Sequence, residues 1–244
     1  MTSLRGKTAV VTGGSSGVGK ATVEALIASG VRVTAVARGA DRLRALEGVA
    51  TLAADAADPT VAERLLRDRP DLVVLAAGIT PAMGPIDDFT WEAFSEIWNT
   101  DLQASFHFIK QALAVPLAPG STVVVVSSGA AIKGSPLSGG YAGAKRMQWL
   151  LAGYAQKVSD AKQLGIRFIA VVPDQLIEGT AIGAHASTVY GAANGMTAAA
   201  FMQRFAKPLD PGGVAAAIVN ALEGGVPLGV TAIAVRGTGS EPLA

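Results

Sequence analysis

The segment 7–19 has the sequence KTAVVTGGSSGVG, in which a short apolar run passes directly into a glycine-rich turn. Lys7–Val11 predicts a buried strand, and the residues after the turn, from about Lys20 to Ser29, predict a helix. In this order, glycines let the backbone approach a pyrophosphate, and the helix N-terminus offers free N–H groups. A turn packed for its own sake is the alternative; we favour nucleotide binding. The contacting residues would be Gly13, Ser15, Ser16, Gly17, Val18 and Gly19.

The alternation of strand and helix continues along the chain. Apolar runs predict further strands at Val31–Ala37, Val49–Ala54, Leu72–Leu75, Val123–Val126, Ile166–Val172 and Val230–Val235. Helical patterns occupy about Trp91–Val115, Tyr141–Leu164 and Pro211–Leu222, and another helix starts at Asp58-Pro59. Such repeats predict a doubly wound α/β fold with a parallel sheet between two helical layers. No linker or repeat divides the chain, so we expect a single domain over residues 1–244.

Composition excludes several classes of protein. The 244 residues are 50% hydrophobic and 16% charged, with a net charge of +1 and no cysteine. The charge and the lack of a basic run argue against a nucleic-acid or membrane surface, and the missing cysteines exclude disulfides and thiol nucleophiles. Two isolated histidines make no metal motif, so no metal is expected. No signal peptide or membrane span is visible, which predicts a cytoplasmic protein.

The end of the second predicted strand indicates which dinucleotide is bound. In dinucleotide folds an acid here binds the ribose 2′-hydroxyl, whereas an arginine suits a 2′-phosphate. Val31–Ala37 is followed by Arg38, and the first acid, Asp41, is expected at the start of the next helix. The sequence therefore favours NADP(H) over NAD(H), unless Arg38 is only a solvated surface residue. Asp55, after the third strand, could bind the adenine amino group or cap a turn.

Tyr141 and Lys145 are four residues apart, so on a helix they share one face about one turn apart. An ammonium beside a phenol stabilises the phenolate, which would let the pair exchange a proton. Ser128 follows the apolar run Val123–Val126, so its hydroxyl is expected at a strand's carboxyl end, where open α/β sheets bind ligands. The spacing alone is common on helices that have no catalytic role. The hydrolase nucleophile elbow, Gly-x-Ser-x-Gly, is absent around Ser128.

Together these landmarks resemble the short-chain dehydrogenase/reductase family over nearly the whole chain. The matching motifs are Thr12-Gly13-x-x-x-Gly17-x-Gly19, Ser128, and Tyr141-x-x-x-Lys145. The resemblance implies a Rossmann fold, a nicotinamide cofactor, reversible carbonyl/alcohol chemistry and a homodimer or homotetramer formed through the two long helices.

The resemblance also implies roles for individual residues. Tyr141 would be the general acid/base, Ser128 would hold the substrate oxygen, and Lys145 would activate Tyr141 and bind the nicotinamide ribose. The cofactor-binding set implied in this way is completed by Asp55 at the adenine, Ala77 and Gly78 beside the adenosine half, and Thr180 at the nicotinamide carboxamide.

The chain departs from the family pattern at four places. Ala76 stands where an asparagine is usual, Asp174 replaces the glycine after Pro173, and Arg236 replaces an aspartate. The family's catalytic asparagine aligns with Asp101. Its backbone carbonyl would still be able to hold the family's water relay to Lys145, and its carboxylate could also pair with Lys145 and blunt its effect on Tyr141.

The segment of about 176–206 is rich in Ala and Gly with scattered Met and Phe, and it matches the family's substrate lid. Its apolar side chains favour a largely uncharged substrate, or else they pack on the sheet or on another subunit. Two functions follow as hypotheses. The first is hydride transfer between NADP(H) and a small-molecule carbonyl or secondary alcohol substrate. The second is a non-enzymatic or catalytically weak NAD(P)-binding regulatory protein.

Overall fold

The strands of the sheet lie in the order β3-β2-β1-β4-β5-β6-β7-β8 within residues 3–243, the part of the chain that the computed structural model describes. The strands are β1 (Thr8–Thr12), β2 (Arg32–Ala37), β3 (Ala50–Ala53), β4 (Leu72–Leu75), β5 (Thr122–Val126), β6 (Arg167–Pro173), β7 (Ala232–Arg236) and β8 (Gly239–Pro242). All are parallel except β8, which runs antiparallel to β7. The strand order reverses between β1 and β4, and such a switch point opens a crevice at the carboxyl ends of the strands.

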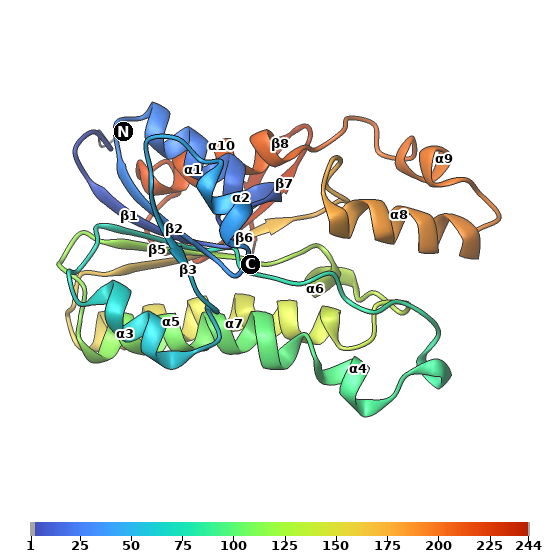
Figure 1. Cartoon of the computed structure of the whole chain (residues 1–244), viewed down its shortest axis with the longest axis horizontal. Helices are drawn as coiled ribbons and strands as arrows, with labels where there is room; N and C mark the ends of the chain where they lie inside the picture. Colours follow the sequence, from blue (N-terminus) through green and yellow to red (C-terminus); the bar gives the residue numbers. More distant parts are fainter. Residues whose placement is uncertain (1–2, 244) are drawn as a thin grey trace.

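Helices cover both faces of the sheet, as expected for a doubly wound α/β fold (Figure 1). The helices are α1 (Gly17–Ala28), α2 (Ala40–Arg44), α3 (Pro59–Leu66), α4 (Trp91–Ser95), α5 (Gln103–Ala114), α6 (Ala130–Lys133), α7 (Tyr141–Ala161), α8 (Ala181–Ala193), α9 (Ala198–Met202) and α10 (Pro211–Leu222). In Figure 1, α1, α2 and α10 lie above the sheet, and α3, α5 and α7 lie below it. Two further turns of helix are η1 (Ile86–Asp88) and η2 (Trp98–Leu102).

The central strands are apolar on both faces because each face is covered by helices. In β4 all residues from Leu72 to Leu75 are buried, and in β5 Val123, Val124 and Val125 are completely buried. Alternate residues of these strands belong to two separate apolar clusters, one with α1 and α10 and one with α3, α5 and α7. The continuous valine run of β5 therefore packs against both helical layers.

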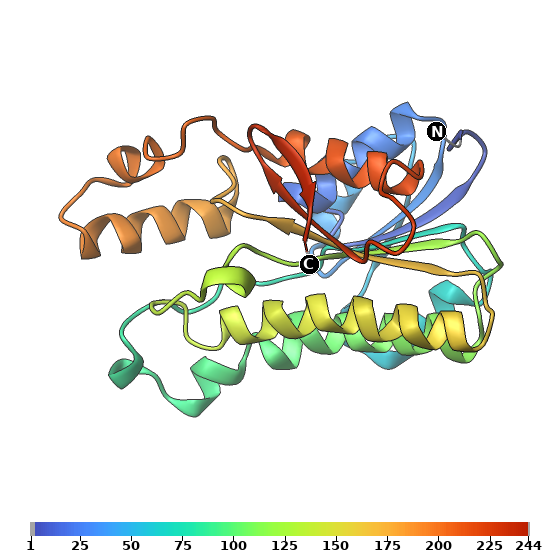
Figure 2. The same cartoon turned by 180° about the vertical axis from the view of Figure 1, so that it is seen from behind.

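The structure differs from the predicted elements in three places. The helix expected over Trp91–Val115 is split into α4 and α5 by η2, a turn of π-helix. The strand expected to be last is followed by β8, whose side chains are all exposed, so it has no apolar run to reveal it. The segment 176–206 contains α8 and α9, and Figure 2 shows both projecting beyond the edge of the sheet.

Other predictions are confirmed residue by residue. Asp58 is the N-cap of α3, accepting a hydrogen bond from the Thr60 N–H at 2.9 Å, and Pro59 occupies the first turn. Asp41 lies in the first turn of α2, as expected. Among the described residues, no helix is both long and apolar enough to cross a membrane.

Candidate active site

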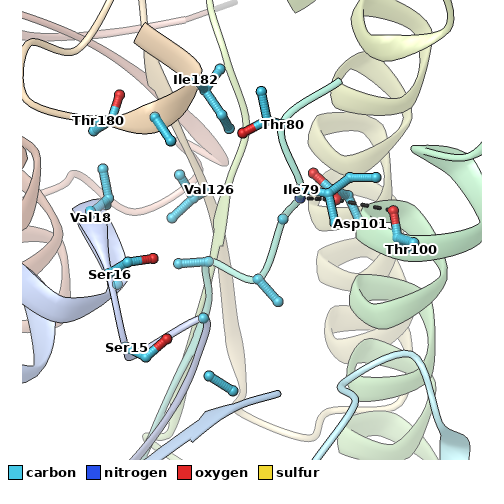
Figure 3. A pocket seen from close by; sticks show the side chains of 18 of the residues that line it. Ser15, Ser16, Val18, Ile79, Thr80, Thr100, Asp101, Val126, Thr180 and Ile182 are labelled. Atoms are coloured by element: carbon cyan, nitrogen blue, oxygen red, sulfur yellow. Dashed lines mark hydrogen bonds between the residues drawn. The ribbon is translucent and has the colours of Figure 1, made fainter. Parts of the chain in front are cut away.

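A crevice of about 490 Å³ opens at the carboxyl ends of the parallel strands, where the strand order reverses. Every residue that the sequence proposed for the site lies along it. These are Gly13, Ser15, Ser16, Gly17, Val18, Gly19, Arg38, Asp55, Ala77, Gly78, Asp101, Ser128, Tyr141, Lys145 and Thr180. Figure 3 shows Ser15, Ser16 and Val18 on one side of the crevice and Thr100 and Asp101 on the other.

The glycine-rich turn between β1 and α1 is packed too tightly for side chains. Gly13 has φ +70°, and a Cβ there would lie 2.5 Å from the carbonyl oxygen of Ala76. A Cβ on Gly19 would lie 2.2 Å from the carbonyl oxygen of Gly13. These two glycines therefore bring β1, α1 and the end of β4 together, which is the close backbone approach that the sequence pattern indicates.

The N-terminus of α1 faces the crevice, and its first backbone N–H groups have no side-chain cap. The Ser16 side chain makes no capping hydrogen bond, and the first turn of the helix carries no acid. Gly17 has φ +50°, and the nearest atom to a Cβ there would be Thr180 Cγ2, at 3.6 Å across the crevice. Uncapped N–H groups at the positive end of a helix, facing an open crevice, suit a phosphate group. These residues fit the pyrophosphate of a dinucleotide.

The other end of the crevice is cationic. Arg38 follows β2 and is exposed, and Arg42, in the short helix α2, also lines the crevice. Sequence reasoning missed Arg42, which lies beyond the end of the strand where the cofactor-reading residue was expected. Asp41 is paired instead with Arg44 on the same short helix. Asp55 lines the crevice, and its carboxylate accepts the N–H of Ala57 at 2.9 Å, so it caps a turn as well.

The start of α7 is fixed by contacts from two other elements. The indole N–H of Trp98 donates to the carbonyl of Gly140 at 3.0 Å, and the Ser127 hydroxyl donates to the carbonyl of Lys145 at 2.7 Å. A Cβ on Gly140 would lie 2.2 Å from the Phe94 carbonyl oxygen. Tyr141 is buried, and the Lys145 ammonium nitrogen lies 5.5 Å from the centre of its ring. These contacts set both side chains toward the crevice.

Asp101 forms an ion pair with Lys145, with Oδ2 2.9 Å from Nζ. Its other oxygen, Oδ1, accepts the N–H of Ile79 at 2.9 Å and the hydroxyl of Thr100 at 3.3 Å (Figure 3). The side chains of Asp101 and Lys145 are 0% and 7% exposed, so solvent screens the pair weakly. Burial lowers the pKa of Lys145, while Asp101 and Tyr141 raise it, and the net direction is upward. Lys145 is therefore a stable ammonium at neutral pH.

The backbone carbonyl of Asp101, expected to hold a water relay, has other partners. It accepts the side-chain amide of Gln148 at 3.0 Å and the hydroxyl of Ser105 at 3.1 Å. The Gln148 amide also donates to the Ser105 hydroxyl at 2.6 Å. This carbonyl thus accepts two protein donors, and the pairing of the carboxylate with Lys145 that the sequence left open is present. Gln148 and Ser105 gave no sequence signal.

The remaining departures from the family pattern have local partners. Where the asparagine is replaced by Ala76, the Thr12 hydroxyl accepts the N–H of Ala77 at 3.2 Å and joins the ends of β1 and β4. Asp174 and Arg236 bind each other, with Oδ2 2.9 Å from Nε and 2.6 Å from the terminal guanidinium nitrogen. Lys133 adds a contact of 3.4 Å to the same carboxylate. Two unusual residues, at the ends of β6 and β7, thus pair with each other, and Arg236 also binds Glu241 at 2.6 Å.

The segment 176–206 is attached to the body of the protein near the C-terminal end of α8. Thr180 is the N-cap of α8, and its hydroxyl accepts the N–H of Gly183 at 3.0 Å. At the other end the Tyr190 hydroxyl lies 2.6 Å from the Ser135 hydroxyl and accepts the N–H of Leu137 at 3.2 Å. Ser135 and Leu137 lie between Ser128 and Tyr141 in the chain. Tyr190 therefore connects α8 to the loop that leads into α7.

Comparison with known proteins decides the family. The family model described as short chain dehydrogenase matches residues 7–188, a range that holds the glycine-rich turn, Ser128, Tyr141 and Lys145. The chain belongs to the short-chain dehydrogenase family. Within this family it is 31% identical over 191 residues to the 2,5-dichloro-2,5-cyclohexadiene-1,4-diol dehydrogenase of Sphingobium indicum, covering 71% of this chain and 74% of that protein.

A second relative and two solved structures extend the comparison. The 2-dehydro-3-deoxy-L-rhamnonate dehydrogenase (NAD(+)) of a Sphingomonas species is 27% identical over 57% of this chain and 61% of its own length. Levodione reductase superposes with a TM-score of 0.82 at 24% identity, covering 97% and 98% of the two chains. An NAD+-bound xylitol dehydrogenase gives 0.78 at 18% identity, covering 90% and 93%. The structural likenesses show the fold, and the family shows that the chain is an oxidoreductase of the short-chain dehydrogenase type with a nicotinamide cofactor.

Proposed function

We propose that this short-chain dehydrogenase transfers a hydride between NADP(H) and a carbonyl or secondary alcohol, with Tyr141 as the general acid/base. One observation carries the proposal: Ser128, Tyr141 and Lys145 line the same crevice as the glycine-rich turn and the uncapped N-terminus of α1. A proton donor and a dinucleotide phosphate site share one crevice, which is what the paired transfer of proton and hydride requires.

The bound nicotinamide would supply or accept the hydride. In the reducing direction the hydroxyls of Ser128 and Tyr141 hold the carbonyl oxygen of the substrate. Tyr141 donates its proton to that oxygen as the carbonyl carbon is reduced, and the resulting phenolate lies beside the Lys145 ammonium. In the oxidising direction the phenolate takes the proton of the alcohol.

NADP(H) is favoured over NAD(H) because of the charges at the end of β2. Arg38 and Arg42 line this part of the crevice, and Asp41 is already paired with Arg44. Guanidinium groups bind a phosphate with two parallel hydrogen bonds and would clamp the 2′-phosphate. In this proposal Asp55 would accept the adenine amino group, Ala77 and Gly78 would lie along the adenosine half, and Thr180 would contact the carboxamide.

The substrate end of the crevice suits an uncharged molecule. The lining of the crevice also includes the uncharged side chains of Ile79, Thr80, Leu176 and Ile182, and its two charged groups nearest Tyr141, Lys145 and Asp101, are paired with each other. The segment 176–206 would act as a lid over this end. A substrate that is a neutral, ring-sized ketone or alcohol is consistent with the apolar lining.

We also propose a cytoplasmic homodimer or homotetramer. Aromatic and aliphatic side chains lie exposed on the outer face of α5 and α7, where Phe106, Tyr154 and Val158 are 46%, 50% and 36% exposed. These two helices lie side by side in Figure 2, so a second copy could cover them together.

The experiment that tests this function is a panel of neutral ketones and secondary alcohols assayed with NADPH and NADH in parallel. Stereospecific, NADPH-dependent reduction of at least one ketone is expected. The competing hypothesis, a regulatory protein that only binds the dinucleotide, predicts binding of NADPH by fluorescence titration with no turnover of any member of the panel.

A further inference from the structure

The ion pair between Asp101 and Lys145 changes what the lysine can do for Tyr141. In an open site a lysine ammonium is a net positive charge, which favours the phenolate of a nearby tyrosine. Here a carboxylate oxygen lies 2.9 Å from that ammonium, and both side chains are buried. Seen from Tyr141, the pair carries no net charge, so most of the ammonium's stabilisation of a phenolate is cancelled.

Within residues 3–243, no other charged side chain forms an ion pair with the ammonium. The loop 76–80 and the end of β5 contain no titratable residue. The remaining titratable groups on the elements packed against α7 have other partners or face solvent. Lys133 and Arg236 pair with Asp174, and Arg167 binds the carbonyls of Val226 and Pro227. His107 lies beside Gln103, and Glu96 and Lys110 are exposed. On the crevice wall, Arg38, Arg42 and Asp55 lie at the ends of β2 and β3, several strands away from β5.

Asp101 is also held firmly in place. Its Oδ1 accepts the N–H of Ile79, and its carbonyl accepts the amide of Gln148. Gly78 has no Cβ, and one there would lie 2.7 Å from Asp101 Oδ2. Glycine at position 78 therefore leaves room for the carboxylate, and the hydrogen bonds from Ile79 and Gln148 hold Asp101 beside Lys145.

From this geometry we infer that Asp101 is a positioning residue that neutralises Lys145 and thereby raises the pH at which Tyr141 gives up its proton-donating form. The chemical step is unchanged: the phenol O–H bond of Tyr141 breaks, its proton forms the O–H bond of the product alcohol, and the hydride forms the new C–H bond. The phenolate then regains its proton from solvent. What Asp101 sets is the pH above which the donor form is lost. The effect of Asp101 on turnover rests on the proposed function. Its effect on the ionisation of Tyr141 is the same whether or not the protein turns over a substrate.

The test is an ultraviolet absorbance titration of tyrosinate in the purified protein without cofactor. Subtracting the same titration of Tyr141→Phe isolates Tyr141 from Tyr154 and Tyr190. In Asp101→Asn, where the ammonium is no longer neutralised, the Tyr141 midpoint is expected about one to two pH units below that of the wild type. An unchanged or higher midpoint would overturn the inference.

A second variant covers the case in which Asp101→Asn does not fold because an ammonium is left buried alone. Asp101→Asn/Lys145→Met removes both charges together. If the wild-type pair is neutral toward Tyr141, this double variant keeps the midpoint within about half a pH unit of the wild type. A rise of more than about one unit would mean that Lys145 acts as a net positive charge in the wild type, and the inference would be wrong.

Kinetics then separate this inference from the proposed function. If the wild type reduces a ketone, the alkaline limb of reduction and the acidic limb of alcohol oxidation should both move to lower pH in Asp101→Asn. A protein without turnover but with the shifted tyrosinate midpoint would refute the proposed function and leave the role of Asp101 intact.

Discussion

Asp101 lies 44 residues before Lys145 in the chain, yet its carboxylate sits 2.9 Å from the lysine ammonium. The contact joins η2 to α7, and both partners are almost completely shielded from solvent. Breaking a buried pair by removing one partner is far more costly than removing both, because the remaining charge has no compensation. The pair therefore governs stability as well as the chemistry of the site.

Asp101→Asn is expected to lower the free energy of unfolding by about 3–5 kcal/mol, because Lys145 is left as a buried, unpaired charge. Asp101→Asn/Lys145→Met should recover most of this loss. Urea unfolding at neutral pH measures both. A double variant no more stable than the single one would show that the loss comes from the Ile79 contact and not from the stranded ammonium.

The pH dependence of stability follows from the raised pKa of Lys145. A raised folded-state pKa means that the folded protein binds this proton more tightly than the unfolded chain. Its stabilisation is complete below the unfolded lysine value of about 10.4 and is lost as pH rises through the folded value. Unfolding free energies of the wild type should therefore fall above about pH 10.4 more steeply than those of Asp101→Asn/Lys145→Met.

Tyr141→Phe is expected to lower turnover by about 10²–10⁴-fold, because the proton donor is lost while the ring remains. The affinity for NADPH, measured by fluorescence titration, should stay within about twofold of the wild type. Tyr154→Phe, on the exposed face of α7, is the matched control and should turn over normally. Substantial activity in Tyr141→Phe would transfer the proton-donor role to another group.

Arg38→Ala is expected to weaken NADPH binding roughly tens- to hundreds-fold and to leave NADH nearly unchanged, because a charge-assisted contact to the 2′-phosphate is lost. Arg42→Ala should show the same preference to a smaller degree. Arg44→Ala, whose partner is Asp41 outside the crevice, serves as the control. Equal losses for the two dinucleotides would mean that Arg38 does not contact the phosphate.

Tyr190→Phe is expected to raise the KM for the ketone roughly fivefold without changing the Kd of NADPH. The variant removes the hydroxyl that contacts Ser135 and Leu137 but keeps the ring stacked on Phe201, 6.0 Å between centroids. One lost hydrogen bond corresponds to about 1 kcal/mol. Ser135→Ala should give a smaller effect that is not additive with it. An unchanged KM in both variants would argue that α8 does not cover the substrate.

Local patterns were sufficient to predict most of the site. Three patterns, each only a few residues long, indicate the site: the glycine-rich turn, Ser128 after a valine strand, and the Tyr141/Lys145 spacing. The topology of a parallel sheet then brings the strand ends to one edge. For this reason all of the proposed residues reach one crevice. The split of the long helix by η2 was not predicted, since Trp98–Leu102 is as compatible with an α-helix as its neighbours are.

Contacts between distant residues could not be predicted from the same patterns. The sequence left open whether the Asp101 carboxylate pairs with Lys145, and only the contact between η2 and α7 shows that it does. The hydroxyl of Tyr190 and that of Ser135 are 55 residues apart, and nothing in either neighbourhood indicates the other. β8 was missed because all four of its residues are exposed and polar, glycine or proline, so it lacks the apolar alternation of a strand.

The pairing of Asp174 with Arg236 has a consequence for recombining members of this family. The two residues are 62 positions apart in the chain, and α8, α9 and α10 come between them in the sequence. A chimera whose junction falls anywhere between them would take the two partners from different parents and leave Asp174 with only the 3.4 Å contact from Lys133. The end of β6 and the C-terminal hairpin therefore make up one exchangeable module, and they should be transplanted together.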